Sequence, residues 1–455
     1  MENKVEIAEN KMGVMPVNKL LLTMSVPMMM SMLVQALYNI VDSIFVARIS
    51  ENALTAVSLA FPLQTLMIAL GGGTGVGINA LLSRSLGEKD REKANKTACN
   101  GVFLAFLSAV VFFVIGLVAV KPFYLSQTND EEIIGYGMQY LTIVCCCSFG
   151  IYMQFIFERL LQSTGKTFYT MITQLCGAVI NLILDPILIF GLFGVPKMGV
   201  AGAAIATVCG QVIAGIIALI INLKKNDEIS LRFKGFRPSK EIILQIYRVG
   251  VPSIIMQSIG SIMVYGMNQI LIAFSATATA VFGVYFKLQS FVFMPVFGLN
   301  NGMIPIIAYN YGAGNRKRLL QTMKLSILYA IGIMSIGCVV FELIPHILFA
   351  FFDASEYMLS MGVPALRIIS IHFPIAGFCI IGGSVFQALG NGVYSMITSI
   401  CRQLVVLLPV AYLLSMLGNV NYVWWAFPIA ELMSLLLTVL FMVVINKKII
   451  SKIGE

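Results

Sequence analysis

Charge is scarce in this chain of 455 residues: Asp, Glu, Lys and Arg together make up 11%, where a soluble globular protein carries about a quarter. Histidine and tryptophan each occur only twice. So few charges exclude an ordinary soluble domain, and two scattered histidines exclude a histidine-based metal centre. What fills the chain instead is 58% hydrophobic residues with a mean hydropathy of +0.90, which indicates a membrane protein.

Catalytic signatures are also missing, since neither HExxH nor GxSxG occurs, and we expect no enzymatic activity. The glycine-rich residues 71–77 fit neither GxGxxG nor a Walker A pattern and lie inside an apolar run, so they are interpreted as a close helix contact. The cysteines lack the spacing of metal or disulfide frameworks and are interpreted as small hydrophobic residues. They are Cys99, Cys145, Cys146, Cys147, Cys176, Cys209, Cys338, Cys379 and Cys401.

Apolar runs of about 20 residues, the length that crosses a bilayer, recur along the whole chain and predict twelve spans. They begin near Leu20, Ala53, Thr97, Ile134, Phe168, Val200, Ile242, Thr277, Leu325, Met358, Tyr394 and Tyr422. Most Lys and Arg, with Arg402 assigned to the loop after the tenth run, fall on one side, which places both termini in the cytoplasm by the positive-inside rule. We therefore expect a multi-pass protein of the cell membrane, with lipid but no nucleic acid as a partner, and no cleaved segment.

An internal repeat organises these spans. Residues 224–241 form the longest polar connection, and the halves on either side match at one constant offset in numbering, as in Gly73/Gly298, Gly77/Gly302 and Gly87/Gly312. This predicts an N-terminal unit over residues 1–225 and a C-terminal unit over residues 226–455, whose first part, to about residue 241, is the linker. The fold class is then an all-α polytopic membrane protein, with two six-helix bundles related by a twofold axis along the membrane normal.

Residues 181–186, Asn-Leu-Ile-Leu-Asp-Pro, are the main candidate site. A carboxylate inside a span is expensive and is typically functional. Asn181 lies one helical turn before Asp185, and Pro186 frees the carbonyl of Leu182, so one turn offers several oxygen ligands for a proton or cation. The alternative is that Asp185 only bonds a neighbouring helix. Asp42 lies at a similar depth in the first span, and the second half has no acid at the matching positions, which are Val406, Val410 and Met267, or Asn268 if one residue is inserted.

Other polar residues within the spans have two interpretations. Lys287 is deep enough to face the interior and to pair there, and it either lines a cavity or forms a structural pair; the same alternatives hold for Glu431. Glu158 and Arg159 are either an inner gate or loop anchors. Glu342, His346 and Arg367 are interpreted as snorkelling, and His372 as an interior histidine. The candidate cavity residues are Gln35, Tyr38, Lys287, Gln289 and Glu431.

The chain resembles the multidrug and toxic compound extrusion (MATE) family. The matching stretches are Pro27 with Asn39 and Asp42, and residues 85–90, 161–165, 181–186, 199–204 with Thr207, and 310–315. The resemblance is to a bacterial branch and implies a cation site in the N-terminal lobe made by Asp42, Asn181, Asp185 and Thr207, with Asn39 beside it. The other branch uses a Glu on the seventh helix, where this chain has Met267 and Asn268.

The resemblance implies a monomeric secondary antiporter that exports small organic cations and drugs in exchange for H⁺ or Na⁺. No cofactor is expected beyond the coupling ion, and no metal beyond Na⁺ at the acidic site. The alternatives are a flippase for lipid-linked precursors or polysaccharides, which would need a strongly cationic cavity, and, more remotely, an intramembrane enzyme.

Overall fold

The computed structural model describes residues 10–352 and 354–454, and within these ranges the chain folds into helices with no strand. The first half contains α1 (Lys11–Val14), α2 (Val17–Ala47), α3 (Glu51–Gly87), α4 (Arg91–Val118), α5 (Val120–Leu125), α6 (Glu131–Cys146), α7 (Phe149–Ser163), α8 (Thr167–Phe190), η1 (Leu192–Gly194) and α9 (Val200–Lys225). The second contains α10 (Lys240–Ile272), α11 (Ala276–Gly312), α12 (Arg316–Leu343), α13 (Pro345–Ala350), α14 (Glu356–Ser370), α15 (Phe373–Ala388), α16 (Gly392–Ile400), η2 (Cys401–Leu407), α17 (Leu408–Ser415), α18 (Val420–Val423), α19 (Ala426–Lys448) and η3 (Ile450–Lys452).

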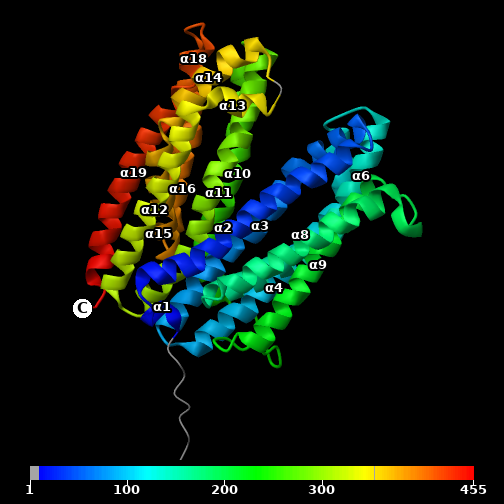
Figure 1. Ribbon diagram of the computed structural model, residues 1–455. Helices are drawn as coiled ribbons and strands as arrows, with labels where there is room; N and C mark the ends of the chain where they lie inside the picture. Colours follow the sequence, from blue (N-terminus) through cyan, green and yellow to red (C-terminus); the bar gives the residue numbers. More distant parts are fainter. Residues whose placement is uncertain (1–9, 353, 455) are drawn as a thin grey trace, which may run out of the picture.

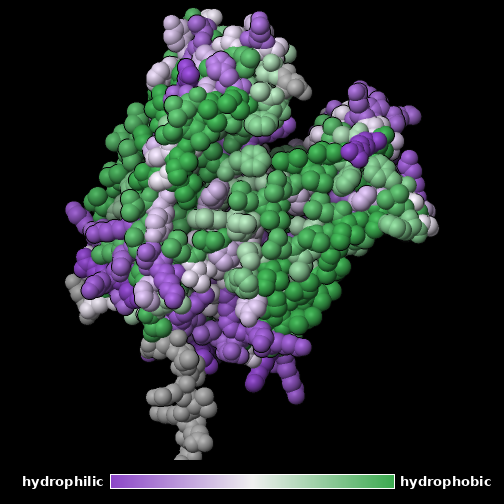
Figure 2. All heavy atoms as spheres, in the orientation of Figure 1, coloured by the Kyte–Doolittle hydropathy of each residue, from purple (hydrophilic) through white to green (hydrophobic). Residues whose placement is uncertain are grey.

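The number of spans agrees with the prediction. In the described part of the chain, ten helices or continuous helical runs are long and apolar enough to cross a bilayer, and two further spans are bent pairs: α6 with α7, at 44°, and α14 with α15, at 50°. Figure 2 shows the corresponding broad hydrophobic surface between hydrophilic ends. The all-α polytopic fold with twelve spans is thereby confirmed.

The repeat extends to the helix caps. Ser50 accepts a hydrogen bond from the backbone N–H of Ala53 and starts α3, and Ser275, its equivalent in the second half, does the same for Ala278 at the start of α11. Asp90 and Asn315 keep the same offset and cap α4 and α12. Short polar side chains that satisfy the free N–H groups of a first turn fix where helices begin, so the two halves begin equivalent helices at equivalent residues.

The two bundles meet at the end of the molecule that carries both termini and diverge toward the other end (Figure 1). The space-filling view shows a notch between the two diverging ends (Figure 2). We use N-terminal bundle for α2 to α9 and C-terminal bundle for α10 to α19. Helix α3 packs on α10, and α11 packs on α2, so the contact between the bundles is itself twofold.

Glycines of the repeat make these crossings possible. A Cβ added at Gly73 would lie 2.7 Å from the backbone nitrogen of Ile254, and one at Gly298 would lie 2.5 Å from the Cα of Met29. Both separations are far below van der Waals contact, so only glycine lets the backbones approach this closely.

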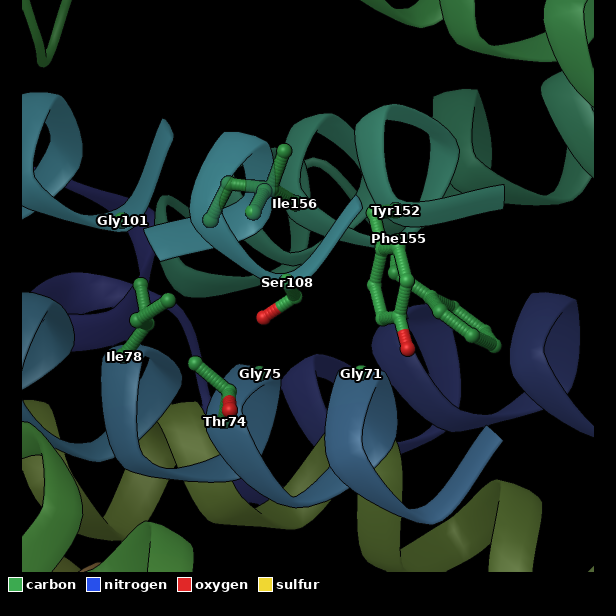
Figure 3. Close-up of a pocket in the computed structure, with 10 residues that line it drawn as sticks. Gly71, Thr74, Gly75, Ile78, Gly101, Ser108, Tyr152, Phe155 and Ile156 are labelled. Carbon is green, nitrogen blue, oxygen red and sulfur yellow. The ribbon is translucent and has the colours of Figure 1, made fainter. Parts of the chain in front are cut away.

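The glycine-rich residues 71–77 are also a packing device, as their spacing indicates. Gly71 and Gly75 face α7 across a small pocket (Figure 3), where an added Cβ would lie 2.6 Å from the ring of Phe155 or 2.8 Å from Cγ of Arg159. The pocket lies between α3, α4 and α7. No phosphate-binding loop is formed here, because these residues lie within a continuous helix.

The short helix α1 joins the two bundles at the end that carries the termini. The Asn10 amide donates to the carbonyl of Thr164 in the N-terminal bundle at 3.2 Å and to Glu228 in the linker at 2.9 Å. Arg318 of α12 donates to the carbonyls of Met12 and Met15 at 3.0 and 2.7 Å. Separation of the bundles at this end would break one of these two sets of contacts.

Candidate cation and substrate site

Helix α8 presents its polar residues to the interior. Val179 and Ile183 are 50% and 56% exposed and form the outward ridge, whereas Asn181 and Asp185 lie about 200° away on the helix, at 2% and 0% exposure. Pro186 is accommodated within the helix, and Gly191, with φ of +75°, ends it. The spacing read from the sequence therefore brings the amide and the carboxylate onto one buried face.

Asp42 of α2 meets Asp185 from the neighbouring helix. The two carboxyl groups lie close enough to interact electrostatically, and each residue is five positions before the end of its helix, which sets them at the same depth. Oδ1 of each residue is buried without a hydrogen-bond partner in the described part of the chain, so both can still accept a proton or a cation.

Asn181 links this carboxyl pair to α9. In the amide orientation that satisfies both neighbours, its nitrogen donates to Asp185 Oδ2 at 3.1 Å, and its oxygen accepts from the N–H and hydroxyl of Thr207 at 3.1 and 3.2 Å. Gly177 and Gly210 allow α8 and α9 to approach, since a Cβ at Gly210 would lie 2.7 Å from the Gly177 carbonyl oxygen. Asp42, Asn181, Asp185 and Thr207 thus converge from α2, α8 and α9, as the resemblance implies.

A pocket adjoins this cluster, with about 650 Å³ of space that is partly open to solvent. Ser31, Gln35 and Tyr38 line it from α2, on the helical face that continues to Asp42. The other polar and aromatic residues of the lining come from α7, α8 and α9: Gln154, Phe155, Glu158, Gln174, Asn181, Thr207 and Gln211. The lining combines amide groups, two aromatic rings and one carboxylate, which suits an amphipathic cation.

Glu158 is a pocket residue that the sequence left between an inner gate and a loop anchor. It is almost fully buried, and its carboxylate accepts hydrogen bonds from Gln154, Thr173 and Gln174 at 3.0, 3.0 and 2.8 Å. Arg159 turns away and donates to Gln162 and Asn301. Gln154, Glu158 and Asn181 lie on helical faces that converge in the pocket. The sequence predicts each face separately, but not the packing of α7 on α8 that brings them together.

The sequence did not point to Tyr140, a further residue near the carboxyl pair. Tyr140 of α6 is buried within electrostatic reach of Asp42 and Tyr38, and its hydroxyl accepts from Gln64 at 3.0 Å. Asn39, by contrast, is exposed and is not among the pocket residues. Apolar periodicity does not single out a tyrosine in a span, so this contact is visible only in three dimensions.

The candidates in the C-terminal bundle are not part of this site. Lys287 is exposed, and its nitrogen lies 6.0 Å from the centre of the Phe352 ring; no carboxylate pairs with it among the described residues. Lys287 is not part of the pocket in the N-terminal bundle, and its role in lining the space between the bundles stays a prediction. Gln289 is half-buried on the same helix. Glu431 is buried and pairs with Arg402 at 3.2 Å.

Arg402 corrects the sequence analysis. It was assigned to a loop between spans, but it lies in η2, a π-helical segment inside the continuous run of residues 392–415. The charge is tolerated there because Glu431 neutralises it. His372 is an interior histidine, as expected, with its Nδ1 bonded to the carbonyl oxygen of Ile369.

Comparisons with known proteins agree with this architecture. The family model described as MatE matches residues 27–187 and again residues 252–413. The chain is 27% identical over 426 residues to the multidrug export protein MepA of Staphylococcus saprophyticus, covering 93% of both chains. It is 26% identical to MepA of Staphylococcus aureus, covering 95% of each.

Solved structures with similar folds include one described as an outward-facing conformation of a multidrug resistance MATE family transporter. It has a TM-score of 0.90, 26% identity, and coverage of 98% of this chain and 99% of the other. A MOP superfamily transporter from Pyrococcus furiosus, reported to have a binding pocket of reverse polarity, also gives a TM-score of 0.90 with 26% identity and 99% coverage of both.

Proposed function

Because this chain belongs to the MatE family, we propose that it is a multidrug efflux antiporter that exports amphipathic organic cations in exchange for H⁺ or Na⁺. The observation that carries the proposal is the Asp42–Asp185 pair, with two buried oxygens that lack a partner among the described residues, beside a pocket lined by Gln35, Tyr38 and Glu158. Two relatives are named multidrug export protein MepA, which supports drugs as the exported compounds.

The coupling follows from charge in a low-dielectric site. Two carboxylates about 4 Å apart repel each other by about 4 kcal/mol at an effective dielectric constant of ~20. The pair therefore takes up a proton or a sodium ion, with Asn181 and Thr207 completing the oxygen ligands. A cation in the adjoining pocket competes for the same negative charge, so the coupling ion and the drug displace each other.

Transport then requires the two bundles to rock. We place both termini in the cytoplasm, so the notch in Figure 2 opens to the outside and the contact through Gly73 and Gly298 closes the inner end. Ion uptake shifts the equilibrium between the two conformations only by its difference in affinity for them. One charge crossing ~100 mV supplies about 2.3 kcal/mol, enough for a gradient of roughly fifty-fold in the drug.

Efflux of ethidium from proteoliposomes tests this function, with the pH and sodium gradients imposed separately. We expect one gradient to drive efflux by the wild type, and Asp42→Asn or Asp185→Asn to abolish gradient-driven efflux. Asp227→Asn, at an exposed loop position, is the matched control and should transport normally. Undiminished gradient-driven efflux by both acidic-site variants would refute the coupling role.

The flippase alternative receives no support from the pocket. A carrier for lipid-linked phosphates needs a cationic cavity, whereas, in the described part of the chain, the one charged residue lining this pocket is Glu158. A pocket with one carboxylate, amides and aromatic rings favours cations over phosphate groups.

A further inference from the structure

The linker between the two bundles contains a basic turn, residues 232–240, with the sequence Arg-Phe-Lys-Gly-Phe-Arg-Pro-Ser-Lys. It carries four cations and no acid. The linker lies at the end of the molecule that carries both termini, where Glu228 accepts a hydrogen bond from Asn10 (Figure 1). Cations on this side of a membrane protein set its topology in general, so the question is whether these four have a partner within the protein.

The protein offers the basic turn no counter-charge. Its four cationic side chains are all exposed: Arg232, Lys234, Arg237 and Lys240. No carboxylate forms a salt bridge with any of them in the part of the chain that the structure describes. Glu241, the residue that follows the turn, instead accepts a hydrogen bond from Gln245 of its own helix at 3.2 Å. Like charges gathered in one turn repel each other, so an anionic partner from outside the chain would stabilise this arrangement.

Helix α4 holds the basic turn in place from both sides. The backbone N–H of Ser230 donates to the side-chain oxygen of Asn95 at 2.7 Å, and the N–H of Ser239 donates to that of Asn100 at 3.0 Å. Between these two attachments Gly235 has a φ of +76°, which residues with a side chain rarely adopt. The cations are therefore presented together by a fixed turn, and a fixed binding surface loses little conformational entropy when a ligand binds.

Two phenylalanine rings place the basic turn at the edge of the hydrocarbon region. The ring centre of Phe236 lies 6.2 Å from that of Phe103 on α4 and 6.1 Å from that of Phe233, which is 49% exposed. Phe103 is seven residues, or about 10 Å, beyond Lys96, the last charged residue of α4. The rings therefore reach the level at which the apolar part of α4 begins, and the neighbouring cations lie at the level of lipid headgroups.

We propose that the basic turn binds an anionic phospholipid of the leaflet at this end of the molecule. The Arg and Lys side chains bind its phosphate group through charge-assisted hydrogen bonds, and the two phenylalanine rings contact the first part of its acyl chains. Each cation beside a membrane strengthens the attraction to anionic lipid about five-fold. A free phosphate ion would gain nothing from the rings, which makes the lipid the occupant. This inference does not depend on the proposed export function.

Native mass spectrometry of the full-length protein in detergent tests this site. Phosphatidylglycerol and phosphatidylcholine with the same acyl chains are titrated separately, and the preference is the ratio of their two dissociation constants. Arg232→Gln/Lys234→Gln/Arg237→Gln removes three cations at exposed positions and leaves the backbone attachments of the turn in place. We expect the wild type to prefer phosphatidylglycerol and this variant to lose about ten-fold or more of that preference. An unchanged preference overturns the proposal.

The matched control is Lys447→Gln/Lys448→Gln/Lys452→Gln, which removes three exposed cations near the C-terminus, at the same end of the molecule. This control should keep the wild-type preference to within about three-fold. An equal fall in both triple variants would show a response to net charge alone and overturn the site.

Two further measurements separate a lipid from a simple anion. Phe233→Ala removes the exposed ring, so the affinity for phosphatidylglycerol should fall about three-fold or more while the preference over phosphatidylcholine stays as in the wild type. Inorganic phosphate, added at the concentration of the lipid, should not displace phosphatidylglycerol. Displacement by phosphate, or an unchanged lipid affinity in Phe233→Ala, would contradict a phospholipid as the occupant of the basic turn.

Discussion

Gly302→Ala perturbs the contact that closes the bundles at the end carrying the termini. The added Cβ would lie 2.7 Å from the Cα of Ser25 on α2, so α11 and α2 must move apart. Overpacking of this kind costs about 1–3 kcal/mol. The helix-propensity gain of alanine over glycine, about 1 kcal/mol, is common to both conformations and cancels. We therefore expect the ratio of the conformation open at this end to the closed one to rise ~5-fold to ~150-fold.

Spin labels at two exposed positions, Asp227, two residues after the end of α9, and Lys317, in the first turn of α12, measure the change by double electron–electron resonance. The longer-distance population should grow in Gly302→Ala. Gly283→Ala is the matched control, because Gly283 lies in the same helix and nothing is within 4 Å of an added Cβ there. Identical distance distributions for the two variants would refute the reasoning, provided that both proteins remain monodisperse.

Arg318→Ala removes charge-assisted bonds to two carbonyls of the α1 region, so hydrogen exchange at residues 10–15 should speed up about ten-fold or more; unchanged exchange would contradict a bridging role. Glu158→Gln places an amide against the Gln174 donor at 2.8 Å and removes the charge in the pocket, so calorimetry should show ethidium binding at least ten-fold weaker; equal affinity would remove Glu158 from the drug site. Thr207→Val deletes the hydroxyl that bonds Asn181, which should weaken coupling-ion affinity about five-fold, while Thr207→Ser should retain it.

Much of the architecture could be predicted because the physical constraints act on local sequence. A span needs about 20 apolar residues, so the spans are visible without a structure. Asn181 and Asp185 could be identified as candidates because they are one helical turn apart and because burying a carboxylate in a span is expensive. The repeat then showed that only one half retains these acids.

What could not be predicted depended on partners distant in sequence. Arg402 was assigned to a loop because an isolated charge interrupts an apolar run, and its neutralising partner, Glu431, lies on a separate helix, α19. Lys287 was expected to pair with a partner, and its neighbour among the described residues is the ring of Phe352, far along the chain. Glu158 was left between an inner gate and a loop anchor, because two of its three hydrogen-bond donors, Thr173 and Gln174, lie on another helix, α8. Helical periodicity predicts which face of a helix is polar or apolar, but not which other helix packs on that face.

The central claim is that drug and coupling ion compete for the Asp42–Asp185 pair. The most direct test adds tetraphenylphosphonium to purified protein in weakly buffered detergent solution and records released protons with a pH indicator and released Na⁺ with a sodium electrode. The wild type should release one of these ions on binding, and Asp42→Asn/Asp185→Asn should bind without releasing it. Release of neither ion by the wild type, or equal release by the double variant, would contradict the account.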